Sequence, residues 1–182
     1  HTFKREYQST KRSDVSVDIV NLDTKYSFKE VVKLRALSSV LKTALREKIR
    51  EDKGQTYGFS LNAKLARYPY EHSKAVIGFT CDPANTDKII AEIKEIIASI
   101  KRDGALLPKH LEDFKAQSEI SIRKDYEKPE FWQNLIISNK IFNTPLYTAD
   151  EYIKAVDSVT NDDIKEAARL YLDEKNMVIS IN

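Results

Sequence analysis

The sequence has one cysteine, Cys81, and only four glycines among 182 residues, and each scarcity excludes a class of site. A single cysteine rules out a disulfide within the chain, and its place in an apolar segment predicts a buried thiol, not a catalytic one. A phosphate-binding loop is also excluded, because neither Gly54 nor Gly58 is followed by the Lys-Ser or Lys-Thr pair that such a loop requires.

Histidines are few as well, and their spacing excludes the usual zinc motifs. His1, His72 and His110 are isolated from one another, and neither H-x-x-E-H nor H-E-x-x-H occurs in the sequence. We therefore expect no metal site in this chain, and we expect His110, at a charged helix start, to face solvent. No nucleophile elbow or Cys–His pairing is visible either, so the residues alone show no complete catalytic set.

Neither an excess of one charge nor a long hydrophobic run is present. The formal net charge is +2, and the 30 basic residues are interleaved with 28 acidic ones, so a nucleic-acid partner is not predicted. No run of about 18 apolar residues occurs, which predicts no membrane span. We see no signal peptide, and because the chain begins at His1 and not at Met we expect a fragment or a processed piece.

Hydrophobic periodicity predicts an α+β fold. Alternating apolar residues indicate four strands, over residues 14–22, 57–65, 75–81 and 177–181. Helix-start residues indicate six helices. Ser27 with Glu30 forms the pattern of a capping box, Thr148 with Glu151 caps a short helix, and Asn85 or Thr86, and Thr160, can cap two more. Pro108 and Pro129 each open a helix. The resulting order, β-α-β-β-α-α-α-α-α-β, predicts one domain over residues 1–182, with helices layered on a mostly antiparallel or mixed sheet.

The corner between the first long helix and the strand after it carries the candidate site. Arg50 lies at the end of the helix, Gly54 where the helix should stop, and Tyr57 at the start of the strand. An arginine offers a fork of donors to a carbonyl or carboxylate, and a tyrosine hydroxyl can donate to a developing oxyanion. Spacing alone still favours a structural role, with Arg50 paired to an acid and Tyr57 packed in the core.

The segment 45–60 resembles a signature of the insulinase/pitrilysin family of zinc metallopeptidases, in which a helix ending in Arg-Glu-x-x-Gly leads to Tyr and a strand. The chain is most similar to the C-terminal portion of bacterial pitrilysin-like zinc proteases, and the resemblance covers nearly all of it. Further matches are Arg67-Tyr68-Pro69, the segment 77–83 with Asn85 after it, and Phe131-Trp132.

This resemblance implies a protease built from two halves. One half carries H-x-x-E-H and a zinc ion whose bound water attacks the peptide. The other half, which this chain resembles, lacks the metal, closes the chamber and contacts the peptide backbone near the scissile bond through Arg50 and Tyr57. The resemblance thus implies that this chain holds no cofactor, is inactive alone, and has the zinc-bearing half and a peptide substrate as its partners.

Bacterial relatives suggest the periplasm as the location, and the cytoplasm fits the single cysteine equally well. Two other interpretations stay open. The chain can be a non-catalytic partner subunit, or a degenerate homologue that serves assembly. It can also be an α+β binding module unrelated to the family.

Overall fold

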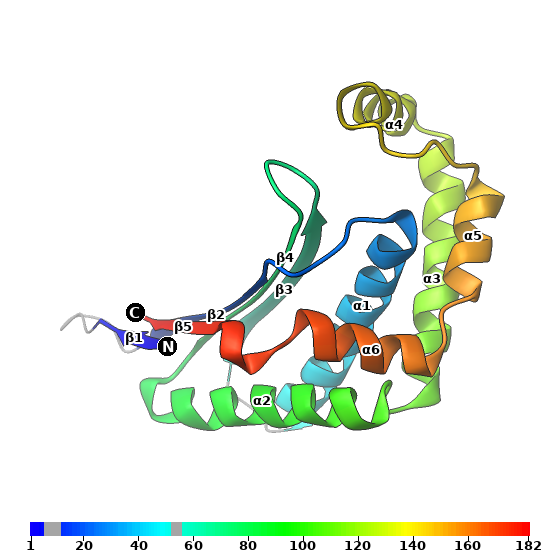
Figure 1. Cartoon of the computed structure of the whole chain (residues 1–182). Helices are drawn as coiled ribbons and strands as arrows, with labels where there is room; N and C mark the ends of the chain where they lie inside the picture. The colour runs from blue at the N-terminus through cyan, green and yellow to red at the C-terminus, as the bar shows by residue number, and fades with distance from the viewer. Residues whose placement is uncertain (6–11, 52–55) are drawn as a thin grey trace.

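The fold is a sheet with helices packed on one of its faces (Figure 1). A computed structural model describes residues 1–5, 12–51 and 56–182, without the side chains of residues 49–51 and 57. Its strands are β1 (Thr2–Lys4), β2 (Ser13–Asn21), β3 (Thr56–Ala66), β4 (His72–Cys81) and β5 (Met177–Ile181). Its helices are α1 (Phe28–Glu51), α2 (Thr86–Asp103), α3 (Pro108–Tyr126), α4 (Pro129–Phe142), α5 (Ala149–Asp157) and α6 (Asn161–Tyr171), with the 3-10 turns η1 (Pro83–Asn85) and η2 (Glu174–Asn176).

The sheet has the strand order β1-β5-β2-β4-β3. The pairs β2–β4, β2–β5 and β3–β4 are antiparallel, whereas β1 and β5 are parallel. The predicted α+β class with a mixed sheet is confirmed. The sequence pattern did not predict β1, because three residues are too few to show alternation. This strand depends on its parallel pairing with β5, beside which the Ile179 amide donates to the His1 carbonyl at 2.8 Å.

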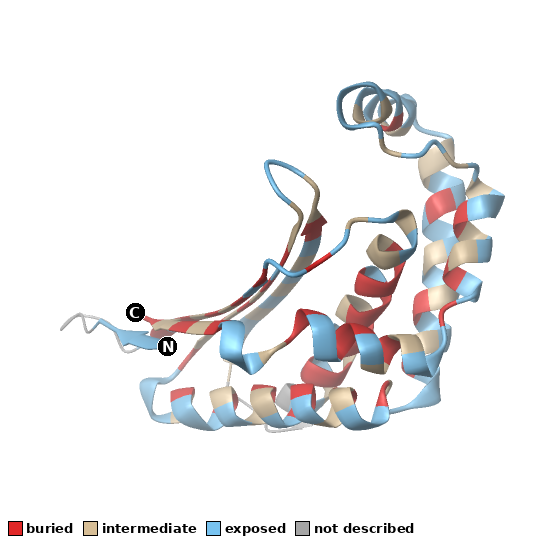
Figure 2. Cartoon of the chain, viewed as in Figure 1, coloured by how far each residue is buried: buried red, intermediate tan, exposed pale blue. Residues whose placement is uncertain are grey.

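The core lies between the sheet and the helix layer, and the burial pattern follows the two periodicities (Figure 2). Alternate residues of β2 and β4 face the helices, and Val17, Ile19 and Ile77 are fully buried. On α1, the residues Leu37, Leu41 and Leu45 recur every four positions and are at most 1% exposed. Each such side chain contributes about 1.5–3 kcal/mol through burial. The opposite sheet face carries mostly small and polar residues, and no helix of the described residues covers it.

Two of the predicted helix caps form in full, whereas Asn85 precedes α2 without a side-chain cap hydrogen bond. Both Thr148 and Thr160 form complete capping boxes, with Glu151 and Asp163 at the third helical position. At α1 only half of the predicted box forms: the Glu30 amide donates to Ser27 Oγ at 3.1 Å. The Glu30 carboxylate instead accepts a hydrogen bond from the Tyr171 hydroxyl at 2.6 Å, which connects α1 to α6.

Lys33 forms a second connection between α1 and α6. The residue is 9% exposed, and its Nζ lies 2.8 Å from Asp163 Oδ1 and 3.5 Å from Glu166 Oε2. Burial acts to raise the pKa of Asp163. Hydrogen bonds from Lys33 and from the Thr160 backbone and hydroxyl outweigh burial and lower this pKa from 3.8 to about 2.

We expect Asp163→Asn to reduce the free energy of unfolding by roughly 1–2 kcal/mol at pH 7 and by little near pH 2. The pKa of Asp163 is lower in the folded chain, so its carboxylate stabilises the fold above about pH 3.8, and the contribution is lost as pH falls through about 2. Urea denaturation at the two pH values measures the difference. Asp162→Asn is the matched control, because Asp162 is exposed and bonds only its neighbour Lys165. An equal cost at both pH values would contradict the assignment.

Candidate functional site

The predicted site residues lie on two elements that pack together. Arg50 is the penultimate residue of α1, and Tyr57 is the second residue of β3. Their side chains, and the predicted helix stop at Gly54, lie outside the described residues, so their contacts with substrate stay predictions. The backbone places the end of α1 and the start of β3 on either side of the short segment 52–55.

The strand is irregular at Tyr57. Thr56 pairs with Cys81 and Gly58 with Thr80, so β3 has one residue more than β4 between these two pairs. Such β-bulges are over-represented beside active sites, where they redirect a side chain or end the pairing. The predicted place of Tyr57 on the same face as Phe59 concerns a side chain outside the described residues and stays a prediction. Nothing in the sequence pattern revealed the bulge.

β3 also forms an edge of the sheet. Among the described residues it pairs with β4 alone, so its outer side presents backbone N–H and C=O groups over Thr56–Ala66. An exposed edge can accept an added strand, and a bound peptide then gains main-chain hydrogen bonds whatever its sequence. The sequence predicted this strand but not its position at the edge, because strand order depends on long-range pairing.

A shallow hollow lies on the uncovered sheet face next to the start of β3. It has a volume of about 470 Å³ and is lined by residues of β2, β3 and β4 together with Asn182. Its floor is low because small residues pair across the strands: Ser60 lies opposite Gly78, and Gly78 lies opposite Ser16. A Cβ at Gly78 would come within 2.8 Å of Ser60 Oγ, so a larger residue there would displace that side chain.

The same face is polar and carries both charges. Thr80 Oγ1 donates to Asp14 Oδ1 at 2.6 Å, and Ser16 Oγ donates to Asp18 Oδ2 at 2.6 Å. Lys74 Nζ lies 3.0 Å from Asp18 Oδ1. Burial acts to raise the pKa of Asp18, but the Ser16 and Lys74 contacts lower it overall, so this carboxylate is charged at neutral pH. The face can thus offer hydrogen bonds to a polypeptide backbone.

Metal-ligating residues do not gather in the described part of the chain: no group of three or more His, Cys, Asp or Glu side chains there could hold a metal ion. Cys81 is fully buried, as predicted, and burial raises the pKa of its thiol. In the same part of the chain, no helix is long and apolar enough to cross a membrane.

The expectation that His110 faces solvent is wrong. This residue is 2% exposed, and its Nε2 lies 2.9 Å from Glu47 Oε2 on α1. The helix-start pattern concealed this, because α3 packs its first turn against α1. The contact joins α3 to a residue three positions before Arg50, near the end of α1.

The matched motif Arg67-Tyr68-Pro69 contacts the end of α4. Arg67 Nη1 donates to the carbonyl oxygens of Phe142 at 3.1 Å and Asn143 at 3.4 Å. The Tyr68 ring lies 5.3 Å from the Phe142 ring, centroid to centroid. A cation at the C-terminus of a helix is favourable because the last carbonyl groups are unpaired. Through these hydrogen bonds and this ring contact, the motif packs the β3–β4 loop against the end of α4.

Comparison with known families and structures identifies similar proteins. The sequence model described as "Peptidase M16 inactive domain" matches residues 8–118. The periplasmic protease PqqL from Escherichia coli matches with a TM-score of 0.79 and 17% identity over 100% of this chain and 20% of its own. A protease from Helicobacter pylori matches with a TM-score of 0.75 and 16% identity over 99% of this chain and 43% of its own.

The peptidase M16 inactive domain from Pseudomonas fluorescens matches with a TM-score of 0.76 and 16% identity, over 99% of this chain and 42% of its own. At these identities the structural matches show a shared fold. The chain spans between one fifth and about two fifths of the length of these three structures. No curated protein sequence matches the chain.

Proposed function

Because the chain belongs to the peptidase M16 inactive-domain family, we propose that it is the substrate-binding, non-catalytic domain of a zinc metalloendopeptidase. In this proposal the chain holds no zinc ion itself: its sequence lacks H-x-x-E-H, and its described residues form no ligand cluster. In this proposal a separate catalytic half of the same protease holds the zinc, and this chain closes the chamber over the peptide.

The observation that carries the proposal is the free edge of β3 with its bulge at Tyr57. A peptide that pairs with this edge would run along the polar hollow and beside the end of α1. Main-chain pairing does not select side chains, which suits a protease that cleaves many sequences.

Arg50 and Tyr57 have distinct roles in this arrangement. The Arg50 guanidinium orients a substrate carbonyl through its fork of N–H donors, and the Tyr57 hydroxyl donates to the oxyanion that develops at the scissile bond. Both groups reach the reacting peptide only when the two halves close, so the isolated chain should not cleave peptides. Periplasmic location is part of the proposal, and the similar structure from Escherichia coli is a periplasmic protease.

The test mixes this chain with a separately produced zinc-bearing half of the same protease and follows cleavage of a quenched fluorescent peptide. We expect neither half alone to cleave the peptide and the mixture of the two halves to cleave it. Association is measured in parallel by analytical ultracentrifugation. Association without cleavage would overturn the substrate-binding role and leave a partner subunit that serves assembly alone.

A further inference from the structure

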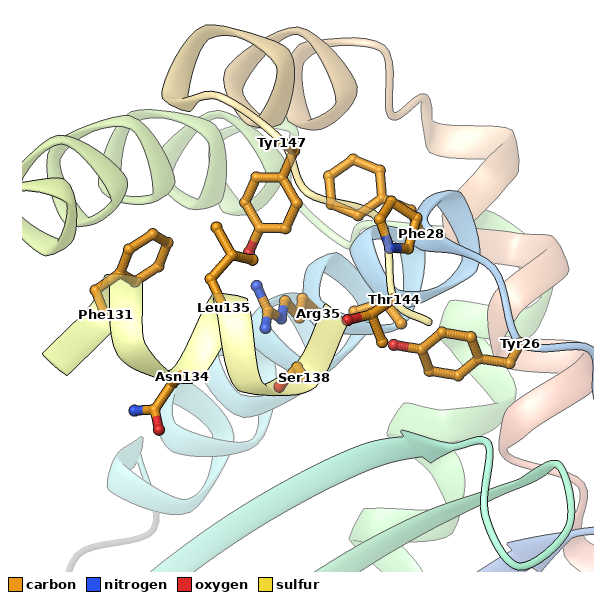
Figure 3. A pocket seen from close by; sticks show the side chains of 11 residues that line it. Tyr26, Phe28, Arg35, Phe131, Asn134, Leu135, Ser138, Thr144 and Tyr147 are labelled. Atoms are coloured by element: carbon orange, nitrogen blue, oxygen red, sulfur yellow. The ribbon is translucent and has the colours of Figure 1, made fainter. Parts of the chain in front are cut away.

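A second cavity separates α1 from α4 (Figure 3). It has a volume of about 310 Å³, at the small end of the range for ligand pockets. Its walls are the start of α1, one face of α4, and the segment between α4 and α5. The lining residues of α4 recur at helical spacing, so this helix turns one face to the cavity and does not pack it against α1; they are Phe131, Asn134, Leu135 and Ser138.

Arg35 is the only charged residue among those that line this cavity. Figure 3 shows its guanidinium among the other side chains that line the pocket. One N–H group, on Nη1, donates to the Tyr152 hydroxyl at 3.2 Å, and the guanidinium also contacts the Tyr147 hydroxyl and lies 5.8 Å from the centre of the Tyr152 ring. In the part of the chain that the structure describes, Arg35 forms no ion pair with a carboxylate.

No carboxylate of the described residues neutralises the Arg35 cation, although Asp125 lies in the neighbouring cavity. Arg35 and Asp125 both line that cavity, but Asp125 pairs with Lys128, 2.8 Å away, and accepts from Ser121. The Arg35 guanidinium therefore retains N–H donors that can bind an anion from outside.

The rest of the pocket suits a ligand that is mostly apolar and carries one polar group. Four aromatic rings line it, those of Tyr26, Phe28, Phe131 and Tyr147. Thr144 also lines it, and the Oγ1 of this residue is buried without a hydrogen-bond partner among the described residues. A ligand group that reaches Arg35 would pass between these rings.

We propose that this pocket binds the free carboxylate of an apolar or aromatic residue. The Arg35 guanidinium takes the carboxylate as a two-point hydrogen-bonded pair, and the rings contact the apolar body. Such a group occurs at the C-terminus of a peptide and in small aromatic acids. The proposal uses neither Arg50 nor Tyr57, so it holds or fails separately from the function proposed above.

The experiment titrates the full chain with N-acetylphenylalanine and with its amide by isothermal calorimetry. We expect the acid to bind about tenfold more tightly, or better, because a hydrogen-bonded charge pair forms only with the carboxylate. Trp132 is the single tryptophan of the chain and follows Phe131 on α4, so its fluorescence reports whether binding occurs at this helix. A short peptide ending in phenylalanine, as acid and as amide, distinguishes peptide ends from small acids as the preferred source.

Matched variants test the role of the charge. Arg35→Met should lower the affinity for the acid to that of the amide. Asn134→Glu adds a carboxylate at an exposed lining position of α4, where the side chain points away from Arg35 in Figure 3; a Glu side chain turned towards Arg35 should weaken the preference that Asn134→Gln retains. Arg123→Met is the control, because Arg123 is an exposed arginine of α3 that pairs with Glu119.

Three results would overturn the proposal: equal affinity of the chain for acid and amide, no binding of either, or an equal loss in Arg35→Met and Arg123→Met. The Asn134 pair keeps the test decisive if Arg35→Met does not fold, because both substitutions are made at an exposed helix position.

Discussion

If the chain works in the proposed two-half protease, we expect Tyr57→Phe to lower kcat of that enzyme by about 10²–10³-fold while leaving KM and the free energy of unfolding nearly unchanged. Removing one hydrogen-bond donor to an oxyanion costs about 2.7–4 kcal/mol in the transition state, which gives this factor. The substitution removes only the hydroxyl, so the strand and its bulge are preserved. Steady-state cleavage of a quenched peptide measures both constants.

A matched control separates the oxyanion role from a general effect of losing a tyrosine hydroxyl. Tyr70 lies in the β3–β4 loop, is 59% exposed and has its ring next to His72. Tyr70→Phe should leave kcat as in the unsubstituted enzyme. If Tyr57→Phe has the same kcat as Tyr70→Phe, Tyr57 has no part in the reaction, and the domain binds substrate through its strand edge alone.

Local interactions explain why most elements could be predicted from the sequence. Thr148 and Thr160 mark helix starts because their hydroxyl groups accept from the amide three residues on, an interaction within four residues. The alternation of β4 survives because one of its faces packs on the helices. At the start of α1 only half of the predicted capping box forms, because the Glu30 carboxylate accepts a hydrogen bond from Tyr171, which is distant in the sequence.

What could not be predicted depends on contacts between distant segments. The edge position of β3 follows from the pairing of β2 with β4 and β5, which no local pattern encodes. The amino-acid sequence of β3 gives no signal of the bulge at Tyr57. The burial of His110 depends on the packing of α3 against α1, and a charged helix start gives the opposite expectation. The site residues themselves came from the family resemblance, since spacing alone favoured a structural role.

We expect Gly104→Ala to reduce the free energy of unfolding by about 2–4 kcal/mol, a large effect for the addition of one methyl group. Gly104 ends α2 with φ = 82° and ψ = −137°, a backbone conformation that other residues adopt only with strain of about 1–3 kcal/mol. The new Cβ would also meet the Asn161 side chain, 2.6 Å from its Cγ. That side chain accepts from the Ala105 amide and donates to the Asp103 carbonyl, both at 2.8 Å, and joins the end of α2 to α6.

Two further variants separate strain from overlap. In Gly104→Ala/Asn161→Ala the overlap is gone but φ stays positive, so the loss should be smaller than the sum of the two single losses and still exceed that of Asn161→Ala. Gly58→Ala is the control: no atom of the described residues lies within 4 Å of a Cβ built at Gly58, so the free energy of unfolding should change by no more than about 0.5 kcal/mol. Equal losses in Gly104→Ala and Gly58→Ala, measured by urea denaturation, would show that the positive φ at the end of α2 does not require glycine.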